Sequence, residues 1–461
     1  MKIFDMASPL DFRYYGYDKE LFEKLKPHVS EEAFIKYQLK VEATLVKIMA
    51  REGICSEKIA EEIEKACTEV TPEEVYAEEK RIKHVVRALV NCIRSKVSQE
   101  AKPYVHLSVT SADITDTATA LRLKDLFNKV ILPDLLRLEK LLIDIARKTS
   151  GVVQIGRTHG KYAVPITFGF AIAKYVSRLG NRIETIKQDV DDLRGKISGA
   201  VGAYNAASLI FDDPESFEKE VLAELGLKPS THSTQIVEPQ FVTDLACSVV
   251  SCFSVLANIA DDFRHLQRSE IQEIEELEEE EKVGSSTMPH KINPWDFEHV
   301  KSMWKAFMPR VVTVFLDEIS EHQRDLTNSA SSRFLIELFV AFDHSVNWLA
   351  DALMKARVNK ENVRRNLERS EEEFVAEPLY ILLAMQGHPD AYDYARKLAA
   401  KARDSDRKLT EIIWKDKSIK PFLDKMTEEQ KAILRNPERY VGISKSKTEA
   451  ICSYWEASLL L

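Results

Sequence analysis

The chain of 461 residues carries a formal net charge of -9, with 74 acidic and 65 basic side chains. A negative balance argues against an extended surface for nucleic acid or for an anionic membrane, so a positive site must be concentrated in a local pocket. The six cysteines form no C-x-x-C pair and no Cys/His cluster at zinc-ligand spacing. This pattern predicts free, mostly buried thiols in a reducing compartment.

The composition predicts a mostly helical protein. Glycine is scarce, at 14 residues, while Leu, Ala, Glu and Lys are plentiful, and the chain is too long for one ordinary single-core domain. The N-terminus has acidic residues and no apolar core long enough for a signal peptide, and we expect no membrane span further along. We therefore expect a cytoplasmic protein without a membrane or nucleic-acid partner.

The first predicted helices form a small N-terminal domain over residues 1–105. Helical spacing begins after Ser30, whose side chain suits an N-cap, and it continues to Gly53. Further helical stretches follow to Lys102 and Pro103.

The next region, residues 106–358, has the pattern of a long-helix bundle. Apolar residues from Ile131 to Ile145 repeat in steps of four and three, with Pro133 near a kink or a helix start. A second stripe runs from Leu245 to Leu266, and neither Gly nor Pro interrupts residues 241–283. If all of those positions were helical they would span roughly 64 Å. A long apolar stripe of this kind favours a helical bundle, or packing against other subunits, over a single solvated helix.

The remaining part completes an all-α prediction with three helical domains. The acidic run at residues 275–282 suits a solvated helix end, with a docking tail as the alternative. Residues 359–461 are predicted to form a separate helical C-terminal domain.

The segment Gly284-Ser-Ser-Thr-Met-Pro-His-Lys-Ile-Asn-Pro294 is the strongest candidate for a functional loop. Its glycine frees the backbone, and its two prolines remove N–H donors and favour extended geometry before them. The segment therefore predicts a mobile loop that carries hydroxyls and a lysine, although a plain surface turn is the alternative.

Three further segments combine polar side chains with turn signals. Residues 108–113 (SVTSAD) either only cap a helix or also bind a carboxylate or phosphate there. Residues 156–160 (GRTHG) present a histidine that is either structural or an acid or base. Residues 322–329 together with Arg333 supply arginines for an oxyanion, or for a surface ion pair with a neighbouring aspartate. No dinucleotide, P-loop, serine-hydrolase or zinc-protease motif occurs among these segments.

The blocks GSSTMPHKINP, GRTHG and TSADITDTA resemble, in their usual order, the signatures of the fumarase/aspartase superfamily. The resemblance covers most of the chain, from about Ser8 to the tail. SPLDFRYYG and HQRDLTNSASSR further resemble the branch whose members act on succinylated purine nucleotides.

The resemblance implies a lyase of purine nucleotide biosynthesis. Such an enzyme cleaves adenylosuccinate to AMP and fumarate, and the succinyl-carboxamide ribotide to its carboxamide and fumarate, by general base and acid β-elimination. It also implies a homotetramer with a central helical bundle, sites that draw their three blocks from three subunits, and neither metal nor organic cofactor. Another fumarate-releasing lyase, a lactonising relative and a non-catalytic structural homologue remain the alternatives.

The resemblance also assigns residues to roles. Ser285 is the base, with Ser286 less favoured, and His159 is the acid. The residues expected to bind substrate are His84, with Thr110, Ser111, Gln235, Lys291 and Asn293 for the carboxylates and Arg13, Tyr14, Arg324, Ser329 and Arg333 for the nucleotide and its phosphate. Val85 stands where the family has an aspartate, and Ser108, Lys161 and Gln323 are smaller departures from the usual pattern.

Overall fold

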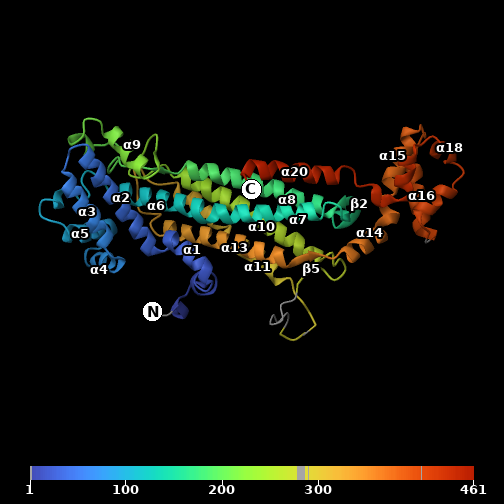
Figure 1. The fold of residues 1–461 in the computed structure, drawn as a ribbon, viewed down its shortest axis with the longest axis horizontal. Helices are drawn as coiled ribbons and strands as arrows, with labels where there is room; N and C mark the ends of the chain where they lie inside the picture. The colour runs from blue at the N-terminus through green and yellow to red at the C-terminus, as the bar shows by residue number, and fades with distance from the viewer. Residues whose placement is uncertain (1–2, 278–285, 289, 406) are drawn as a thin grey trace. The chain divides into compact units, whose positions relative to one another are not determined.

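The computed structural model describes residues 3–277, 286–288, 290–405 and 407–461, and these residues are mainly helical (Figure 1). The predicted all-α fold is confirmed. Within the described ranges, strands occur only as three short two-stranded sheets, of which two are antiparallel and one is parallel. The pairs are β1 (Val153–Thr158) with β2 (Lys161–Thr167), β3 (Arg194–Gly195) with β4 (Lys228–Pro229), and β5 (Ile274–Glu276) with β6 (Ala356–Val358).

The chain forms two compact units, each assembled from three separate stretches. Unit 1 comprises Met1–Leu135, Arg182–Ser254 and Ser302–Asn347, and unit 2 comprises Leu136–Asn181, Val255–Lys301 and Trp348–Leu461. The division into three sequential domains stays a prediction.

Unit 1 contains the helices of the N-terminal region, in which α2 packs against α3, α6 and α9 (Figure 1). The predicted N-cap is confirmed, since Ser30 Oγ accepts a hydrogen bond of 3.1 Å from Ala33 N. The helices are α1 (Lys19–Val29), α2 (Glu31–Arg51), α3 (Glu57–Glu69), α4 (Pro72–Ile82), α5 (Val85–Ser95), α6 (Ser111–Leu126), α9 (Pro214–Glu224) and α12 (Arg310–Asp317), with short helical turns at Ile3–Asp5, Leu10–Tyr15, Lys102–Tyr104, Phe127–Ile131, Ala207–Leu209 and Ser331–Phe334.

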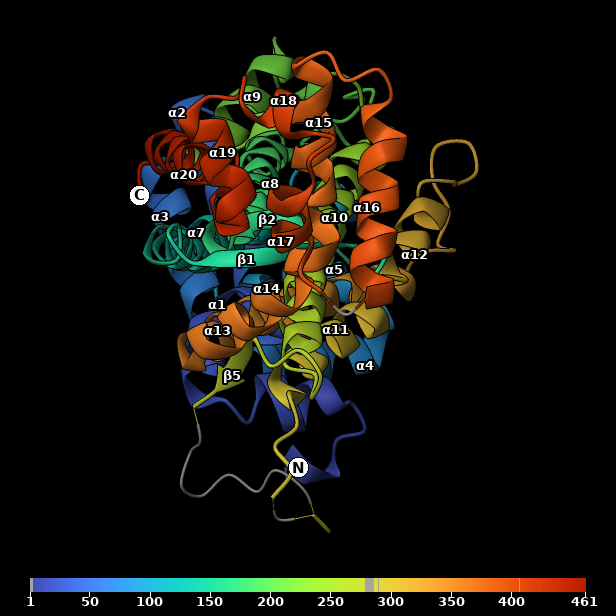
Figure 2. The ribbon, with the colours of Figure 1, turned by 90° about the vertical axis from the view of Figure 1, so that its right-hand side faces the viewer.

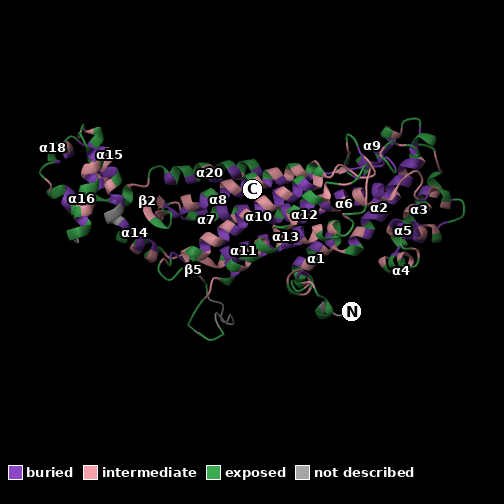
Figure 3. Ribbon diagram, turned by 180° about the vertical axis from the view of Figure 1, so that it is seen from behind, coloured by how far each residue is buried: buried purple, intermediate pink, exposed green. Residues whose placement is uncertain are grey.

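Five long helices contain residues of both units. They are α7 (Leu132–Lys148), α8 (Phe168–Asp191), α10 (Gln240–Leu266), α11 (Trp295–Phe307) and α13 (Leu335–Lys355). Pro133 occupies the second position of α7, which follows α6 and the π-helical turn Phe127–Ile131 without a break, so Pro133 does not begin a separate helix. The predicted stripe on α10 is buried: Leu245, Val249, Cys252, Leu256 and Ile259 are all 0% exposed (Figure 3).

Two expectations about the region of α10 are wrong. The helix ends at Leu266 instead of continuing toward residue 283: residues 267–271 form turns, and Gln272, whose φ is +50°, leads toward β5. Glu275 and Glu276 therefore lie in a strand that pairs with β6, and not at a solvated helix end. The rest of the acidic run, residues 278–282, lies outside the described residues.

α10 is also long and apolar enough to cross a membrane by length and composition, contrary to the expectation that no segment would be. Of its most apolar window, 56% is buried inside the protein. A core helix passes the same test, so length and composition alone do not make α10 a membrane span.

Unit 2 contains the C-terminal helices and the β1–β2 hairpin, which lies beside α14 (Figure 2). Ile155 of β1 joins a buried cluster with residues of these helices, including Leu367, Val375, Leu379 and Leu409. The helices are α14 (Lys360–Phe374), α15 (Ala376–Met385), α16 (Ala391–Ser405), α17 (Leu409–Lys415), α18 (Lys420–Leu423), α19 (Glu428–Arg435) and α20 (Ser444–Leu459), with a short helical turn at Pro437–Arg439.

Candidate active site

His159 stands at the tip of the β1–β2 hairpin, in unit 2. Thr158 and Lys161 form the last pair of the ladder, and the two residues between them have φ of +53° for His159 and +72° for Gly160. Two left-handed residues in a two-residue loop define a type I′ turn, whose twist matches that of the strands. The exposed imidazole is thus presented by a strained turn, as the GRTHG segment predicts.

The N-terminus of α6 carries Thr110 and Ser111, in unit 1, and the predicted cap is confirmed. Asp113 Oδ2 accepts a hydrogen bond of 2.7 Å from Thr110 N, and Asp113 N donates to Thr110 O over 3.1 Å. This reciprocal pairing fixes the residue before the helix and the first turn together. Both hydroxyl-bearing residues remain partly exposed.

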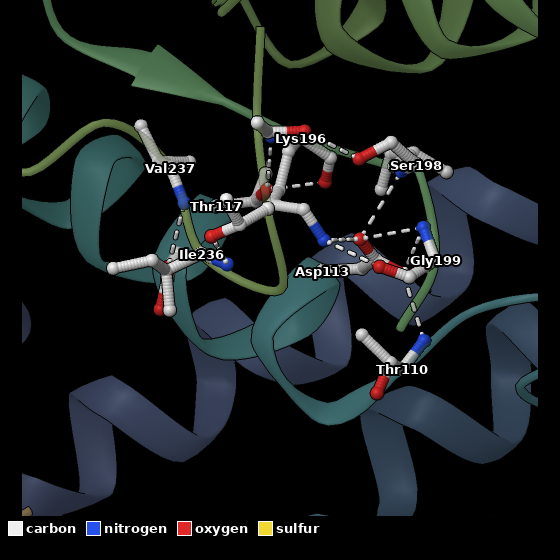
Figure 4. Close-up of polar contacts among 12 residues, drawn as sticks. Thr110, Asp113, Thr117, Lys196, Ser198, Gly199, Ile236 and Val237 are labelled. Atoms are coloured by element: carbon white, nitrogen blue, oxygen red, sulfur yellow. Dashed lines mark hydrogen bonds and ion pairs between the residues drawn. The ribbon is translucent and has the colours of Figure 1, made fainter. Parts of the chain in front are cut away.

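Asp113 also forms a fully buried ion pair with Lys196 (Figure 4). Oδ1 of the carboxylate accepts from Ser198 N at 3.1 Å, and the two oxygens accept from Gly199 N at 3.3 and 3.2 Å. Lys196 Nζ donates to Gly199 O over 3.0 Å. The start of α6 is therefore joined to residues 196–199 by one buried carboxylate.

Helix α6 also holds the segment that contains Gln235. Asp116 Oδ2 accepts a hydrogen bond of 3.1 Å from Val237 N, two residues after Gln235 (Figure 4). Burial raises the pKa of Asp116 above its ordinary value, and the Val237 N–H and the Lys196 charge oppose that shift. α6 thus anchors both Gln235 and the pair Thr110 and Ser111, which the resemblance assigns to the carboxylates.

A cavity of about 650 Å³ in unit 1 collects the predicted phosphate residues. Arg324, Ser329 and Arg333 all line it. Arg122 and Arg194 also line it, and a buried guanidinium nitrogen on each of Arg122, Arg194 and Arg324 has no hydrogen-bond partner among the described residues. Acidic residues line the same cavity, so its arginines lie among carboxylates: Glu31, Glu79, Asp116, Glu238 and Asp317.

Arg324 and Asp325 do not form the alternative ion pair with each other. Arg324 donates to Asn328 Oδ1, while Asp325 accepts from the hydroxyl and N–H of Thr327 and from Glu321 N. The Thr327 hydroxyl bond and these two N–H groups lower the pKa of Asp325 to about 2.

Arg13, Tyr14 and His84 belong to the same unit but are not among the residues that line this cavity. Arg13 is exposed, and the Tyr14 ring lies 5.2 Å from that of His344. His84 caps α5, with its Nδ1 accepting from Arg87 N at 3.1 Å, while the neighbouring Val85 lines the cavity. The residue that replaces the family aspartate therefore contributes an apolar wall.

Lys291 and Asn293 lie in unit 2, in a non-helical segment directly before α11. The loop prediction is confirmed for residues 286–288 and 290–294, with Lys291 N donating to Met288 O over 3.0 Å and Trp295 N to Asn293 O over 2.9 Å. Ser285 lies outside the described residues. Among the described candidates, unit 2 holds His159, Ser286, Lys291 and Asn293, and unit 1 holds all the others.

Sequence reasoning missed three side chains that organise these segments: Lys196, Arg194 and Glu273. Lys196 meets Asp113 across 83 positions, and Glu273 meets Arg157 across 116. No local motif marks either residue. The only signal available in the sequence was the presence of Asp113 and Arg157 inside the singled-out segments.

Comparison with known proteins identifies the family. Residues 1–307 match the family model described as lyase, and residues 320–441 match the model described as adenylosuccinate lyase C-terminal. The adenylosuccinate lyase of Pyrococcus abyssi is 36% identical over 454 residues, which are 97% of this chain and 98% of the relative. That of Archaeoglobus fulgidus is 34% identical over 450 residues, with the same coverage of 97% and 98%.

The fold is shared with a solved 3-carboxy-cis,cis-muconate lactonizing enzyme from Pseudomonas putida. The TM-score is 0.82 over 98% of this chain and 99% of the other, at 21% sequence identity, which shows the fold alone. With the helical fold, the motif segments and these matches together, the chain belongs to the lyase family of the fumarase/aspartase superfamily, in its adenylosuccinate lyase branch.

Proposed function

We propose that this carbon–nitrogen lyase cleaves adenylosuccinate to AMP and fumarate, and the succinyl-carboxamide ribotide to its carboxamide and fumarate. The observation that carries the proposal is the grouping of Arg324, Ser329 and Arg333 on one cavity with further arginines. A phosphate would give an acceptor to the guanidinium nitrogens of Arg122, Arg194 and Arg324 that have no hydrogen-bond partner among the described residues. This grouping favours a phosphorylated substrate over those of other fumarate-releasing or lactonising relatives.

The reaction needs a base and an acid at separate positions. The base removes the proton from the carbon next to a carboxylate, the electron pair forms the fumarate double bond, and the carbon–nitrogen bond breaks. The acid then protonates the departing nitrogen. We assign the base to Ser285, from family resemblance, and the acid to His159, whose exposed position at a hairpin tip leaves its ring nitrogens accessible.

The carboxylate that accepts the carbanion's charge needs fixed donors. Thr110 and Ser111 supply hydroxyl donors at the positive end of α6, while the Thr110 N–H is donated to Asp113. Lys291 adds a full charge, while Gln235 and Asn293 add amides. Arg13, Tyr14 and His84 complete the proposed nucleotide site from elsewhere in unit 1.

The shared site in a homotetramer is proposed from the family resemblance, which implies sites built from blocks of three subunits. Exposed apolar side chains point to self-association as well: Val312, Phe315 and Leu316 of α12 and the nearby Ile319 are 51–78% exposed. Such a patch marks an interaction surface in soluble proteins. We place the enzyme in the cytoplasm, which the six free cysteines support.

The proposal is tested by following the absorbance change with adenylosuccinate and, in parallel, with argininosuccinate. Turnover of the first substrate alone is expected. Ser285→Ala should abolish turnover while adenylosuccinate still binds, and His159→Gln should lower turnover to a small residual rate. Arg333→Ala should weaken nucleotide binding by about 1.5–3 kcal/mol, the range for a hydrogen bond to a charged group. A chain that is inactive on adenylosuccinate, or a fully active His159→Gln variant, would contradict the assignment.

A further inference from the structure

Glu273 is a buried carboxylate with four hydrogen-bond donors around it. It is 0% exposed and precedes β5 in unit 2. Oε1 accepts from Arg157 Nη2 at 2.6 Å and from Asn366 Nδ2 at 2.9 Å. Oε2 accepts from Gln154 Nε2 at 2.6 Å and from Arg157 Nη1 at 3.1 Å. A carboxylate has about four acceptor positions, so this one is fully satisfied.

Two of the three donor residues belong to β1, the strand that leads to His159. Side chains alternate along a regular strand, so Gln154 and Arg157, three positions apart, would face opposite sides. The register shifts between Ile155 and Arg157, however, and such a bulge brings both side chains to the same side. A Cβ at Gly156 would lie only 2.7 Å from Val164 O, so the bulge requires glycine there.

The backbone of Glu273 is held by hydrogen bonds as well. Glu273 N donates to Leu266 O and Glu273 O accepts from Asn359 N, each over 2.9 Å. Asn366 of α14 also donates to Ile271 O over 2.8 Å. The carboxylate is thus held by both its backbone and its side-chain partners.

A two-stranded hairpin has little stability by itself. Its direction must be set by what it packs against, and β1 and β2 pack against α14 (Figure 2). The bidentate pair between Glu273 and Arg157 adds an orientation-specific link two residues before the tip. A shift of that link moves the imidazole directly, since only Thr158 lies between Arg157 and His159.

We propose that Glu273 is a positioning residue for His159, which it orients through Arg157 and Gln154. The inference rests on the proposed function, in which His159 is the acid. Misplacement of a reacting group by about 1 Å can lower a rate by about a hundredfold. Glu273 therefore contributes to turnover without touching the substrate.

The test compares kcat and KM for adenylosuccinate in the full chain. Glu273→Gln keeps the side-chain volume but replaces one accepting oxygen with a donor. We expect kcat to fall about tenfold or more with KM changed less than about threefold, because the acid is displaced while the binding groups are not. Arg157→Lys keeps the charge and loses the bidentate geometry, and it should show the same pattern if Glu273→Gln fails to fold.

The matched control is Glu456→Gln. Glu456 forms a bidentate pair with Arg147, at 3.1 and 2.9 Å, which joins α20 to α7 in the same unit. The match is one of geometry, because the Glu456 side chain is 41% exposed and that of Glu273 is 0% exposed. This variant loses a bidentate Arg–Glu pair away from His159 and should retain wild-type kcat. A similar fall in kcat for both glutamate variants would mean a general loss of structure and would overturn the proposal.

A double variant separates positioning from stability. If Glu273 acts through His159, then Glu273→Gln should have no further effect on the residual rate of His159→Gln. A second loss of the same size in the double variant would overturn the positioning role. Normal kcat in Glu273→Gln with a nearly inactive His159→Gln variant would also refute it and leave the proposed function intact. A fully active His159→Gln variant would instead remove the acid assignment itself.

Discussion

At the scale of single residues, Glu139 of α7 is an uncompensated buried carboxyl. It is 0% exposed, and neither oxygen has a hydrogen-bond partner among the described residues. Burial raises its pKa from the ordinary range of a glutamate to about 9. The group is therefore neutral at pH 7 in the folded protein and ionised in the unfolded chain.

This difference predicts a stability that falls with rising pH. Between pH 5 and pH 9 the unfolded state binds fewer protons at Glu139 than the folded state does, so Glu139 should lower the free energy of unfolding by roughly 1 kcal/mol per pH unit. Glu139→Gln cannot ionise and should lack this component. Urea unfolding at a series of pH values and fixed protein concentration measures how the free energy of unfolding changes with pH in the wild-type chain and in the variant. Identical slopes for the two proteins would show that Glu139 is not the cause.

The pair Asp113 and Lys196 is the opposite case, a buried charge with a full set of partners. Asp113→Asn leaves Lys196 buried without a counter-charge, and we expect a loss of about 3–5 kcal/mol in unfolding free energy. Adding Lys196→Met removes the orphaned charge and should recover part of that loss. Denaturant unfolding of both single variants and the double variant tests this coupling. Strictly additive losses would mean that the two groups do not stabilise each other.

At the scale of elements, α8 and α20 approach each other closely at one glycine in unit 2. A Cβ at Gly180 would overlap the ring of Trp455, which is only 4% exposed. The absence of a side chain at Gly180 therefore lets the indole sit directly on the backbone of α8. This contact joins the last helix of the chain to the centre of unit 2.

Gly180→Ala should destabilise the protein even though alanine is the better helix former. The clash forces Trp455 to move, at a cost of about 1–3 kcal/mol, and the propensity gain of roughly 1 kcal/mol offsets only part of it. Thermal unfolding followed by tryptophan fluorescence measures the change. Gly151→Ala is the control, since a Cβ there meets nothing within 4 Å. Equal behaviour of the two variants would argue against tight packing at Gly180.

At the scale of the whole molecule, the candidate site residues are divided between two compact units. His159 and Lys291 both belong to unit 2, but the family resemblance implies sites whose sequence blocks come from three subunits, so we expect one subunit to supply His159 and another Lys291 to the same site. Two inactive chains should then complement each other, because a mixed assembly contains some sites with no altered residue.

Mixing His159→Gln and Lys291→Ala subunits should therefore restore activity. For random assembly from equal amounts, a site that takes these residues from two different subunits is intact in up to about a quarter of cases. Activity is measured after the two chains are dissociated and reassembled together, with each chain treated alone as the control. An inactive mixture of confirmed tetramers would mean that one chain supplies both residues.

The sequence by itself determined the local features. Helical periodicity predicted the buried stripe of α10, Ser30 and the pair Thr110 and Asp113 predicted caps, and GRTHG predicted a strained turn at His159. These features depend on interactions within a few residues, so the amino-acid pattern carries them directly. The roles of Ser285 and the other site residues came from family resemblance and stay predictions.

The tertiary structure decided what depends on partners far apart in the chain. α10 ends at Leu266, and the chain after it turns and pairs β5 with β6, although neither Gly nor Pro interrupts the sequence there. The partners of Asp113 and Glu273 come from 83 and 116 positions away. Which carboxylate is buried, and which cation meets it, depends on how the elements pack, and neither periodicity nor motif spacing contains that information.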